Sequence, residues 1–403
     1  MSRVERVGVA APSRGRIGAI DGMRGLAALA VLVFHTYNTT APGWESITWM
    51  PTPLRLLLAH LGHLAVVLFF VLSGLLVGSP FVRAALGCRE RVHLRRYAVA
   101  RVARIFPAWW LMLVVVVLVG NRELIAQPGR LALFATLQQN YDSATVGVVV
   151  PHGWSLAIEV SFYAALPVAA LLASAAIKVV APERRAQVVA ALVSGAVLAA
   201  LAFSWVWFNL TPHGHPDRRP LSFSLFAYGG AFALGMLVAL VAETARGIRP
   251  RSMIRRWAAP VALASWLIGL TAAPTIEQEL IPFVFALLTL SVVFKSSAGG
   301  SGVLAFRPLR RLGEISYGVY LWHLPLLYAG LGLGIVPRDQ PVWTPVVVAG
   351  LLALSALVAE LSWRLLEQPI VSFVAARGRP RSAGRTSLSS PCIAVTRKPR
   401  THS

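Results

Sequence analysis

Two ionisable side chains, Arg24 and His35, lie within an apolar stretch of the sequence, DGMRGLAALAVLVFH (residues 21–35). A helix advances by ~100° and ~1.5 Å per residue, so the interval between them returns His35 to the face of Arg24, ~16 Å further along the axis. That face carries a permanent cation near one end and a proton-transfer group toward the other. Ionisable groups are costly in hydrocarbon and often mark functional sites. The alternative is that Arg24 snorkels to the headgroups and His35 caps the outer end of the helix.

A carboxylate, Glu159, lies more than one turn inside a second apolar segment, HGWSLAIEVSFYAALP (152–167). Ser155, Glu159 and Tyr163 recur at a spacing that puts them on one side of a helix. An ionised carboxylate at this depth must meet a cation or line a wet cavity, unless it keeps its proton. With His35 at a similar depth, the two groups could form a base and its orienting carboxylate. The other interpretation is a structural pair that joins two helices.

Two further cations, Arg101 and Arg104, lie three residues apart in RRYAVARVARIFPAWW (95–110), where another apolar segment begins. At this spacing the two side chains share one helix face. Basic residues commonly flank the cytoplasmic ends of membrane spans, but these two lie deeper than orientation requires. Paired guanidinium groups match phosphate oxygens, so the pattern favours a phosphorylated ligand that arrives from the cytoplasm.

A polar stripe runs through LGEISYGVYLWHLPLL (312–327), where Ser316, Tyr320 and His323 align at helical spacing. A histidine on such a stripe is more often a hydrogen-bonded core residue than a catalyst. We therefore rank His323 below His35 as a catalytic candidate.

A single serine, Ser73, interrupts the apolar stretch GHLAVVLFFVLSGLLVG (62–78) and is followed by Gly74. Close helix packing through small residues is the simpler interpretation of this pair. The sequence shows no zinc-ligand spacing, phosphate-binding glycine loop or nucleophile elbow, so we predict no metal site.

Composition identifies the elements that must position these residues. The chain of 403 residues is 56% hydrophobic and 13% charged, whereas a soluble protein carries about a quarter charged residues. We expect an all-α, polytopic membrane bundle of about ten helices, each close to the ~20 residues that cross the hydrocarbon core. The expected spans are 18–37, 54–79, 98–120, 154–178, 187–208, 222–243, 256–273, 277–295, 312–333 and 342–366.

The net charge of +22 would suggest nucleic acid binding in a soluble protein, but its placement gives another explanation. Arg and Lys crowd into every second connection between the expected spans and are sparse in the others, as the positive-inside rule requires. We expect both termini in the cytoplasm and no nucleic acid partner. The expected organisation is a cytoplasmic tail (1–17), a membrane domain (18–370) and a basic, disordered cytoplasmic tail (371–403).

Six stretches, taken in order, resemble the acyltransferase 3 family, integral membrane proteins that include O-antigen, exopolysaccharide and macrolide O-acyltransferases. The stretches are IDGMRGLAALAVLVFH, LFFVLSGLLVG, RRYAVARVARIFPAWW, HGWSLAIEVSFY, LGEISYGVYLWHLPL and LLEQP. The family's arginine–ten–histidine motif, paired arginines and two acids fall on Arg24, His35, Arg101, Arg104, Glu159 and Glu367.

The resemblance implies a multi-pass enzyme of the bacterial cytoplasmic (inner) membrane that modifies cell-envelope polysaccharides or similar acceptors. It would move an acyl group, usually acetyl, from cytoplasmic acyl-CoA to a hydroxyl of a glycan, glycolipid or small molecule. No permanently bound cofactor is expected, and acyl-CoA would be the donor substrate. The partners would be this donor, the acceptor and membrane lipid.

The resemblance also implies roles for the site residues. Arg101 and Arg104 would hold the CoA phosphates, and Arg24 would assist them or stabilise charge deeper in the channel. His35 would be the general base or a transient acyl carrier, and Glu159 would orient His35 or itself accept the proton. The other candidates would line the cavity or support it: Ser73, Ser155, Tyr163, Tyr320, His323 and Glu367.

Two other functions fit some of the same residues. In a proton-coupled transporter, Arg24, His35 and Glu159 would form a relay. Against it stand the arginine pair and the lack of two matching halves with broken helices. A membrane sensor that binds acyl-CoA without turnover is the other alternative.

Overall fold

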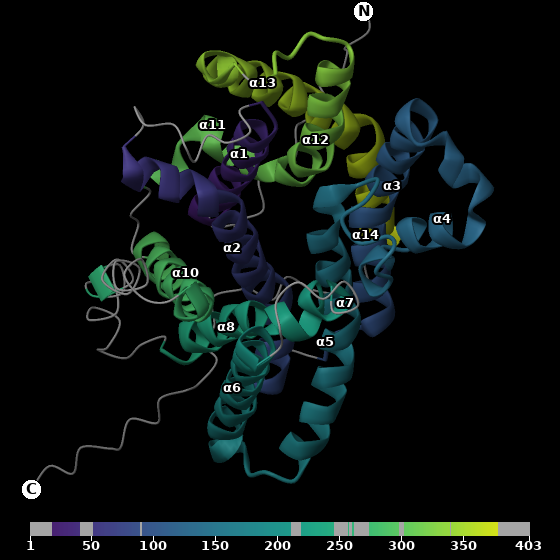
Figure 1. Ribbon diagram of the computed structural model, residues 1–403. Helices are drawn as coiled ribbons and strands as arrows, with labels where there is room; N and C mark the ends of the chain where they lie inside the picture. The colour runs from purple at the N-terminus through teal and green to yellow at the C-terminus, as the bar shows by residue number, and fades with distance from the viewer. Residues whose placement is uncertain are drawn as a thin grey trace, which may run out of the picture.

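The computed structural model describes residues 18–40, 51–88, 91–210, 219–245, 257, 260–261, 274–297, 302–338 and 340–377. Over these ranges the chain forms helices joined by short turns, and no strand occurs in them (Figure 1). The longer helices of the first half are α1 (Gly18–Thr40), α2 (Thr52–Ala85), α3 (Leu94–Gly120), α4 (Pro128–Ala135), α5 (Trp154–Lys178) and α6 (Arg185–Leu210). The second half contains α7 (Arg219–Ser222), α8 (Leu225–Thr244), α10 (Pro274–Ser297), α11 (Arg307–Glu314), α12 (Ser316–Gly332), α13 (Thr344–Ser362) and α14 (Gln368–Arg377).

Within the described residues, seven helical segments are long and apolar enough to cross a membrane. They correspond to α1, α2, α3, α5, α6, α8 and the continuous segment Pro341–Arg377 that includes α13 and α14. The expected all-helical membrane bundle is confirmed at this level. The count of about ten spans and the cytoplasmic position of both termini stay predictions.

The three other expected spans have different outcomes. Helix α10 occupies the expected span 277–295, whereas the expected span 256–273 lies largely outside the described residues. The expected span 312–333 is not one helix, because Ile315 (φ −97°, ψ 8°) separates α11 from α12. Helix α14 continues to Arg377, past the expected start of the C-terminal tail at residue 371. Both expected tails otherwise fall outside the described residues.

Helix α1 is held against α11 by contact between their backbones. A Cβ atom added to Gly313 would lie 1.7 Å from the Asp21 carbonyl oxygen, and one added to Gly25 would lie 2.4 Å from the Leu309 carbonyl oxygen. Only glycine permits such an approach, and small residues serve this purpose in membrane helix pairs. The crossing brings Arg24 beside the first residue of α12.

Helices α2 and α8 form a second close crossing. A Cβ atom added to Gly74 would lie 2.1 Å from the Phe232 carbonyl oxygen, and one added to Gly235 would lie 2.1 Å from that of Val71. The packing explanation therefore holds for Gly74. Its neighbour Ser73 faces a different space, described below.

The chain between α13 and α14 is a π-helical turn, Trp363–Glu367. Such turns carry an extra residue and are frequent at functional sites. In Figure 1 the end of this segment lies beside α3, and the contacts of Trp363 and Glu367 with Arg104 confirm that proximity. The C-terminal part of the described chain thus supports Arg104 of α3.

Candidate active site

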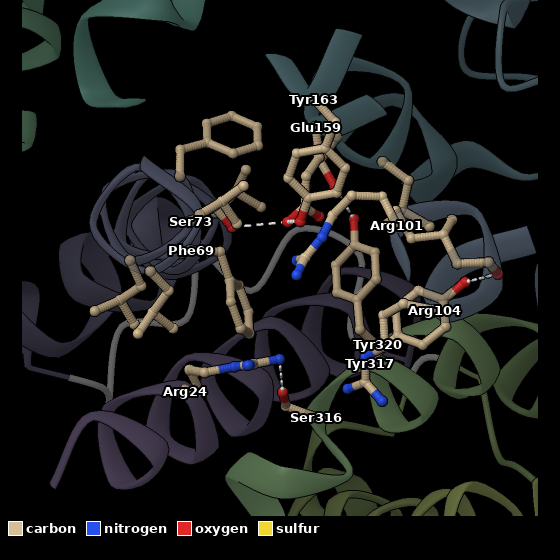
Figure 2. Close-up of a pocket in the computed structure, with 18 residues that line it drawn as sticks. Arg24, Phe69, Ser73, Arg101, Arg104, Glu159, Tyr163, Ser316, Tyr317 and Tyr320 are labelled. Carbon is tan, nitrogen blue, oxygen red and sulfur yellow. Dashed lines mark hydrogen bonds between the residues drawn. The ribbon is translucent and has the colours of Figure 1, made fainter. Parts of the chain in front are cut away.

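A cavity of about 130 Å³ lies between α1, α2, α3, α5 and α12, and Figure 2 shows it. We call it the arginine cavity, because guanidinium groups from two helices line it. Its lining residues are Arg24, Val66, Phe69, Phe70, Leu72, Ser73, Leu76, Val77, Arg101, Arg104, Ile105, Ser155, Leu156, Glu159, Tyr163, Ser316, Tyr317 and Tyr320. The structure thus brings Arg24, Arg101, Arg104 and Glu159, from three different helices, to one space.

Arg24 enters the cavity from α1. Its Nη2 donates a hydrogen bond to Ser316 Oγ at 3.1 Å, at the start of α12. Figure 2 shows Arg24 and Arg101 reaching into the cavity from opposite sides. Arg24 is thus a cation inside the helix bundle, and the interpretation that it snorkels to the headgroups does not describe its contacts.

Glu159 is held by hydroxyl groups from two helices. Ser73 Oγ donates to Glu159 Oε1 at 2.7 Å, and Tyr163 Oη donates to the same oxygen at 2.5 Å. The Ser73 bond explains why a hydroxyl lies in the apolar face of α2. With Oε1 engaged twice, Oε2 is the oxygen more available to a ligand or a cation.

Arg101 and Arg104 share a helix face, as their spacing predicted, but have different surroundings. The Arg101 guanidinium carbon lies 5.8 Å from the ring centre of Tyr97 and 5.6 Å from that of Tyr163. Arg104 lies 4.8 Å from the Trp363 ring centre and pairs with Glu367, Nη1 to Oε2, at 3.3 Å. Aromatic faces stabilise guanidinium groups without occupying their hydrogen-bond donors in the plane.

Glu367 does not line the cavity but holds Arg104, which does. The residue is 2% exposed, and Ser362 Oγ donates to its second oxygen at 3.3 Å. Sequence analysis left its role open between lining and scaffold, and its contacts are those of a residue that positions Arg104.

His35 is paired with His323 rather than with Glu159. His35 Nδ1 lies 2.9 Å from His323 Nε2, and His323 Nδ1 lies 2.6 Å from the Tyr320 carbonyl oxygen. His323 is 0% exposed. Neither His35 nor His323 is among the described residues that line the arginine cavity. In the described part of the chain, His35 and Glu159 therefore do not form the direct pair that the sequence allowed.

A third histidine, His152, completes what we call the histidine cluster: His35, His152 and His323. The His152 and His323 ring centres are 5.2 Å apart. His152 is 1% exposed, and its Nε2 lies 3.1 Å from the Leu321 carbonyl oxygen. Sequence analysis missed it, although its position three residues before Ser155 in HGWSL was an available signal.

Tyr320 connects the histidine cluster with the arginine cavity. Its hydroxyl donates to the His152 carbonyl oxygen at 2.6 Å and lies 2.7 Å from Ser155 Oγ. A phenol has one proton, so Ser155 is the donor in the second bond. Because Tyr320 lines the cavity and its carbonyl holds His323, one residue of α12 contributes to both regions.

Comparison with known families decides what this arrangement belongs to. A family model described as "Acyltransferase domain", that of acyltransferase 3, matches residues 17–360. The chain belongs to the acyltransferase 3 family. The family resemblance of the six sequence stretches is thereby confirmed.

Several curated acyltransferase 3 relatives are similar over most of this chain. Putative peptidoglycan O-acetyltransferase YrhL of Bacillus subtilis is 28% identical over 88% of this chain and 55% of its own length. Peptidoglycan O-acetyltransferase OatA of Listeria monocytogenes is 24% identical over 89% of this chain and 56% of its own length. The chain thus spans about half the length of these two relatives.

A third acyltransferase 3 relative is matched over nearly its whole length. Putative membrane-bound transacylase BcsY of Komagataeibacter xylinus is 28% identical over 93% of this chain and 89% of its own length. No solved structure matches the chain.

Two groups of side chains can supply chemistry in this acyltransferase 3 protein. Among the residues described, no group of three or more His, Cys, Asp or Glu side chains could hold a metal ion. The arginine cavity supplies cations for an anionic ligand, and the histidine cluster supplies a group that can move a proton.

Proposed function

We propose that this protein is a membrane O-acyltransferase that moves an acyl group, acetyl in the first instance, from acyl-CoA to a hydroxyl of a glycan. The observation that carries the proposal is the meeting of Arg24, Arg101 and Arg104 in one cavity linked through Tyr320 to His35. Cations at one end and a proton acceptor toward the other are what transfer from a phosphorylated donor requires.

The donor would bind with its phosphates at Arg101 and Arg104. Arg101 Nε is buried and has no hydrogen-bond partner among the described residues. A buried donor without an acceptor is costly, so an anionic oxygen at this position would be stabilised. From these arginines the flexible pantetheine arm would lead the thioester toward the outer half of the bundle.

His35 would act as the general base on the acceptor. Its Nε2 would take the proton of the acceptor hydroxyl while that oxygen attacks the thioester carbonyl carbon. The tetrahedral intermediate would collapse with cleavage of the C–S bond, and His35 would return the proton to the departing CoA thiolate. The products are the ester and free CoA thiol, and no further reactant is needed.

Arg24 and Glu159 would control charge inside the cavity. Arg24 lies in the cavity ~16 Å along the helix axis from His35, so it would stabilise a donor phosphate rather than the negative oxygen of the intermediate. Glu159, held by Ser73 and Tyr163, would offset part of the positive charge of the arginines while the donor is absent. Because Glu159 bonds to Ser73 and Tyr163 while His35 pairs with His323, the role of Glu159 as the orienting group of His35 loses its geometric basis.

The names of the relatives support a glycan as acceptor. Two are named peptidoglycan O-acetyltransferases, one of them as putative, and the third is named a putative membrane-bound transacylase. We extend this to peptidoglycan or another cell-envelope polysaccharide as the acceptor, and to the bacterial cytoplasmic membrane as the location of the enzyme. The comparisons give the transporter interpretation no support.

The test is acyl-CoA turnover by purified protein in nanodiscs, with glycan fragments as acceptors and release of free CoA thiol as the signal. We expect His35→Ala to abolish release while acyl-CoA still binds, and Arg101→Ala to weaken acyl-CoA binding. Arg95→Ala, which removes an exposed arginine of the same helix, is the matched control and should leave both unchanged. Wild-type protein that fails to bind acyl-CoA would overturn the donor assignment. Binding of acyl-CoA with no release of free CoA in the presence of any acceptor would favour the sensor.

A further inference from the structure

The contacts of His323 determine which nitrogen of each histidine carries a proton. His323 Nδ1 lies 2.6 Å from the carbonyl oxygen of Tyr320. A carbonyl oxygen only accepts hydrogen bonds, so Nδ1 must carry the proton. His323 is completely buried, and burial favours the neutral imidazole because removing a charge from water is costly. Nε2 of a neutral His323 is therefore an unprotonated acceptor.

The proton assignment passes from His323 to His35. Their 2.9 Å contact joins His323 Nε2 with His35 Nδ1. Since His323 Nε2 accepts, His35 Nδ1 must donate and carries a proton. A neutral His35 then has its lone pair on Nε2, the nitrogen that faces away from His323.

We propose that His323 is a positioning residue that fixes the tautomer and ring orientation of His35 so that Nε2 is the reactive nitrogen. This inference rests on the proposed function, in which His35 is the base. Free histidine in water favours the opposite tautomer, with the proton on Nε2. The bond from His35 Nδ1 to His323 reverses that preference and also stabilises the imidazolium formed when Nε2 takes a proton.

The chain of contacts that orients His35 ends on backbone. It runs from His35 to His323 and then to the Tyr320 carbonyl of α12. The Tyr320 side chain is itself anchored to the His152 carbonyl and Ser155. In many catalytic sites a carboxylate orients the base, but here a second imidazole does so without adding a negative charge to a buried region. Two other titratable side chains, His152 and Tyr320, pack against His323, with ring centres 5.2 Å and 5.7 Å from its own.

The first test reads the tautomer directly, without any reaction. In protein with ¹⁵N-labelled histidine, held in nanodiscs, the ring nitrogen shifts of His35 are assigned by their loss in His35→Gln. We expect the Nδ1–H tautomer in the wild type and a shift toward Nε2–H in His323→Leu. Finding Nε2–H in the wild type, or the same tautomer in both proteins, would overturn the inference.

The second test separates positioning from packing through kinetics. We expect His323→Leu to lower kcat by ~10- to 100-fold, the range known for groups that orient functional histidines, with KM for acyl-CoA unchanged. His323→Gln, whose amide oxygen can accept from His35 Nδ1, should recover most of the loss. His63→Leu, at a histidine packed 6.1 Å from the Tyr228 ring, is the matched control. Glutamine no better than leucine, or a parallel rise in KM, would refute a positioning role.

Failure of this inference is distinguishable from failure of the proposed function. If the wild type never turns over acyl-CoA, the proposed function fails, and the NMR test still reports the tautomer. If the wild type is active and depends on His35 but not on His323, the positioning role alone is wrong.

Discussion

The arginine cavity and the histidine cluster meet at α12 but hold their polar groups in opposite ways. In the cavity, long side chains rest on aromatic rings or on other side chains, as Arg104 does on Trp363 and Glu367. In the cluster, His152 and His323 are nearly or completely buried, and each contacts a backbone carbonyl. The first arrangement can rearrange around a ligand, whereas the second keeps one geometry. Adaptable groups suit substrate binding, and rigid groups suit proton transfer.

The largest effect should come from breaking the rigid region at its centre. His35→Gln is expected to lower kcat by ~10²- to 10⁴-fold, the usual contribution of a general base. If His35 and His323 act as a unit, the double variant with His323→Leu should be no slower than His35→Gln alone. Steady-state rates of CoA release measure this. Fully additive losses would show that the histidines act independently and would remove the contrast between the regions.

The next effect concerns the adaptable region. Arg101→Lys keeps the charge but loses the planar fork that lies near the rings of Tyr97 and Tyr163. We expect acyl-CoA affinity to fall by ~10- to 100-fold, the loss of one or two charge-assisted hydrogen bonds, with kcat much less affected. Isothermal titration with acyl-CoA and with dephospho-CoA checks this. Equal affinity of wild type and variant would mean that Arg101 acts only as a charge.

A smaller effect is expected from breaking the pair of Glu367 with Arg104. Glu367→Gln leaves Arg104 without its buried carboxylate and should destabilise the protein by ~1–3 kcal/mol. The fall in Tm should be accompanied by a few-fold weaker binding of acyl-CoA. Glu360→Gln removes an acid that pairs with Arg311 and Arg364 nearer the surface. It is the control and should cost below ~1 kcal/mol.

The smallest effect tests how firmly Glu159 is held. Tyr163→Phe removes one of the two hydrogen bonds to Glu159 Oε1. We expect it to raise the free-energy barrier to acyl transfer by ~1 kcal/mol, which lowers turnover about five-fold. Ser73→Ala removes the other bond and should have a similar effect. If either variant loses activity as completely as His35→Gln, Glu159 belongs to the rigid chemistry of the site and not to its adaptable part.

The sequence predicts the members of the site better than their pairing. Ionisable residues in apolar helices are costly, and this alone selects Arg24, Arg101, Arg104 and Glu159, all of which line one cavity. Helical periodicity gives the face of a side chain on its own helix, but not which neighbouring helix meets that face. The partner of His35 was therefore uncertain, and the structure places His323 there.

The helical composition of the fold was also predictable, while its interruptions were not. Hydropathy detects apolar length and so marks the spans, but it is insensitive to the backbone contact of Gly313 with Asp21. The break at Ile315 lies two residues after that contact. Likewise, the acid of LLEQP was identified through the family resemblance, but its contact with Arg104 is made from the π-helical turn Trp363–Glu367 before α14.

The crossing at Gly25 and Gly313 fixes α1 at one point, beside Arg24. His35 lies ~16 Å from this point along the helix axis, so a tilt of α1 about the crossing would move His35 much more than Arg24. A small change in the tilt of α1 would leave Arg24 almost in place but would stretch or compress the contact of His35 with the fixed His323 of α12. A change in bilayer thickness that alters the tilt of α1 is therefore expected to change the rate of transfer more than the affinity for the donor.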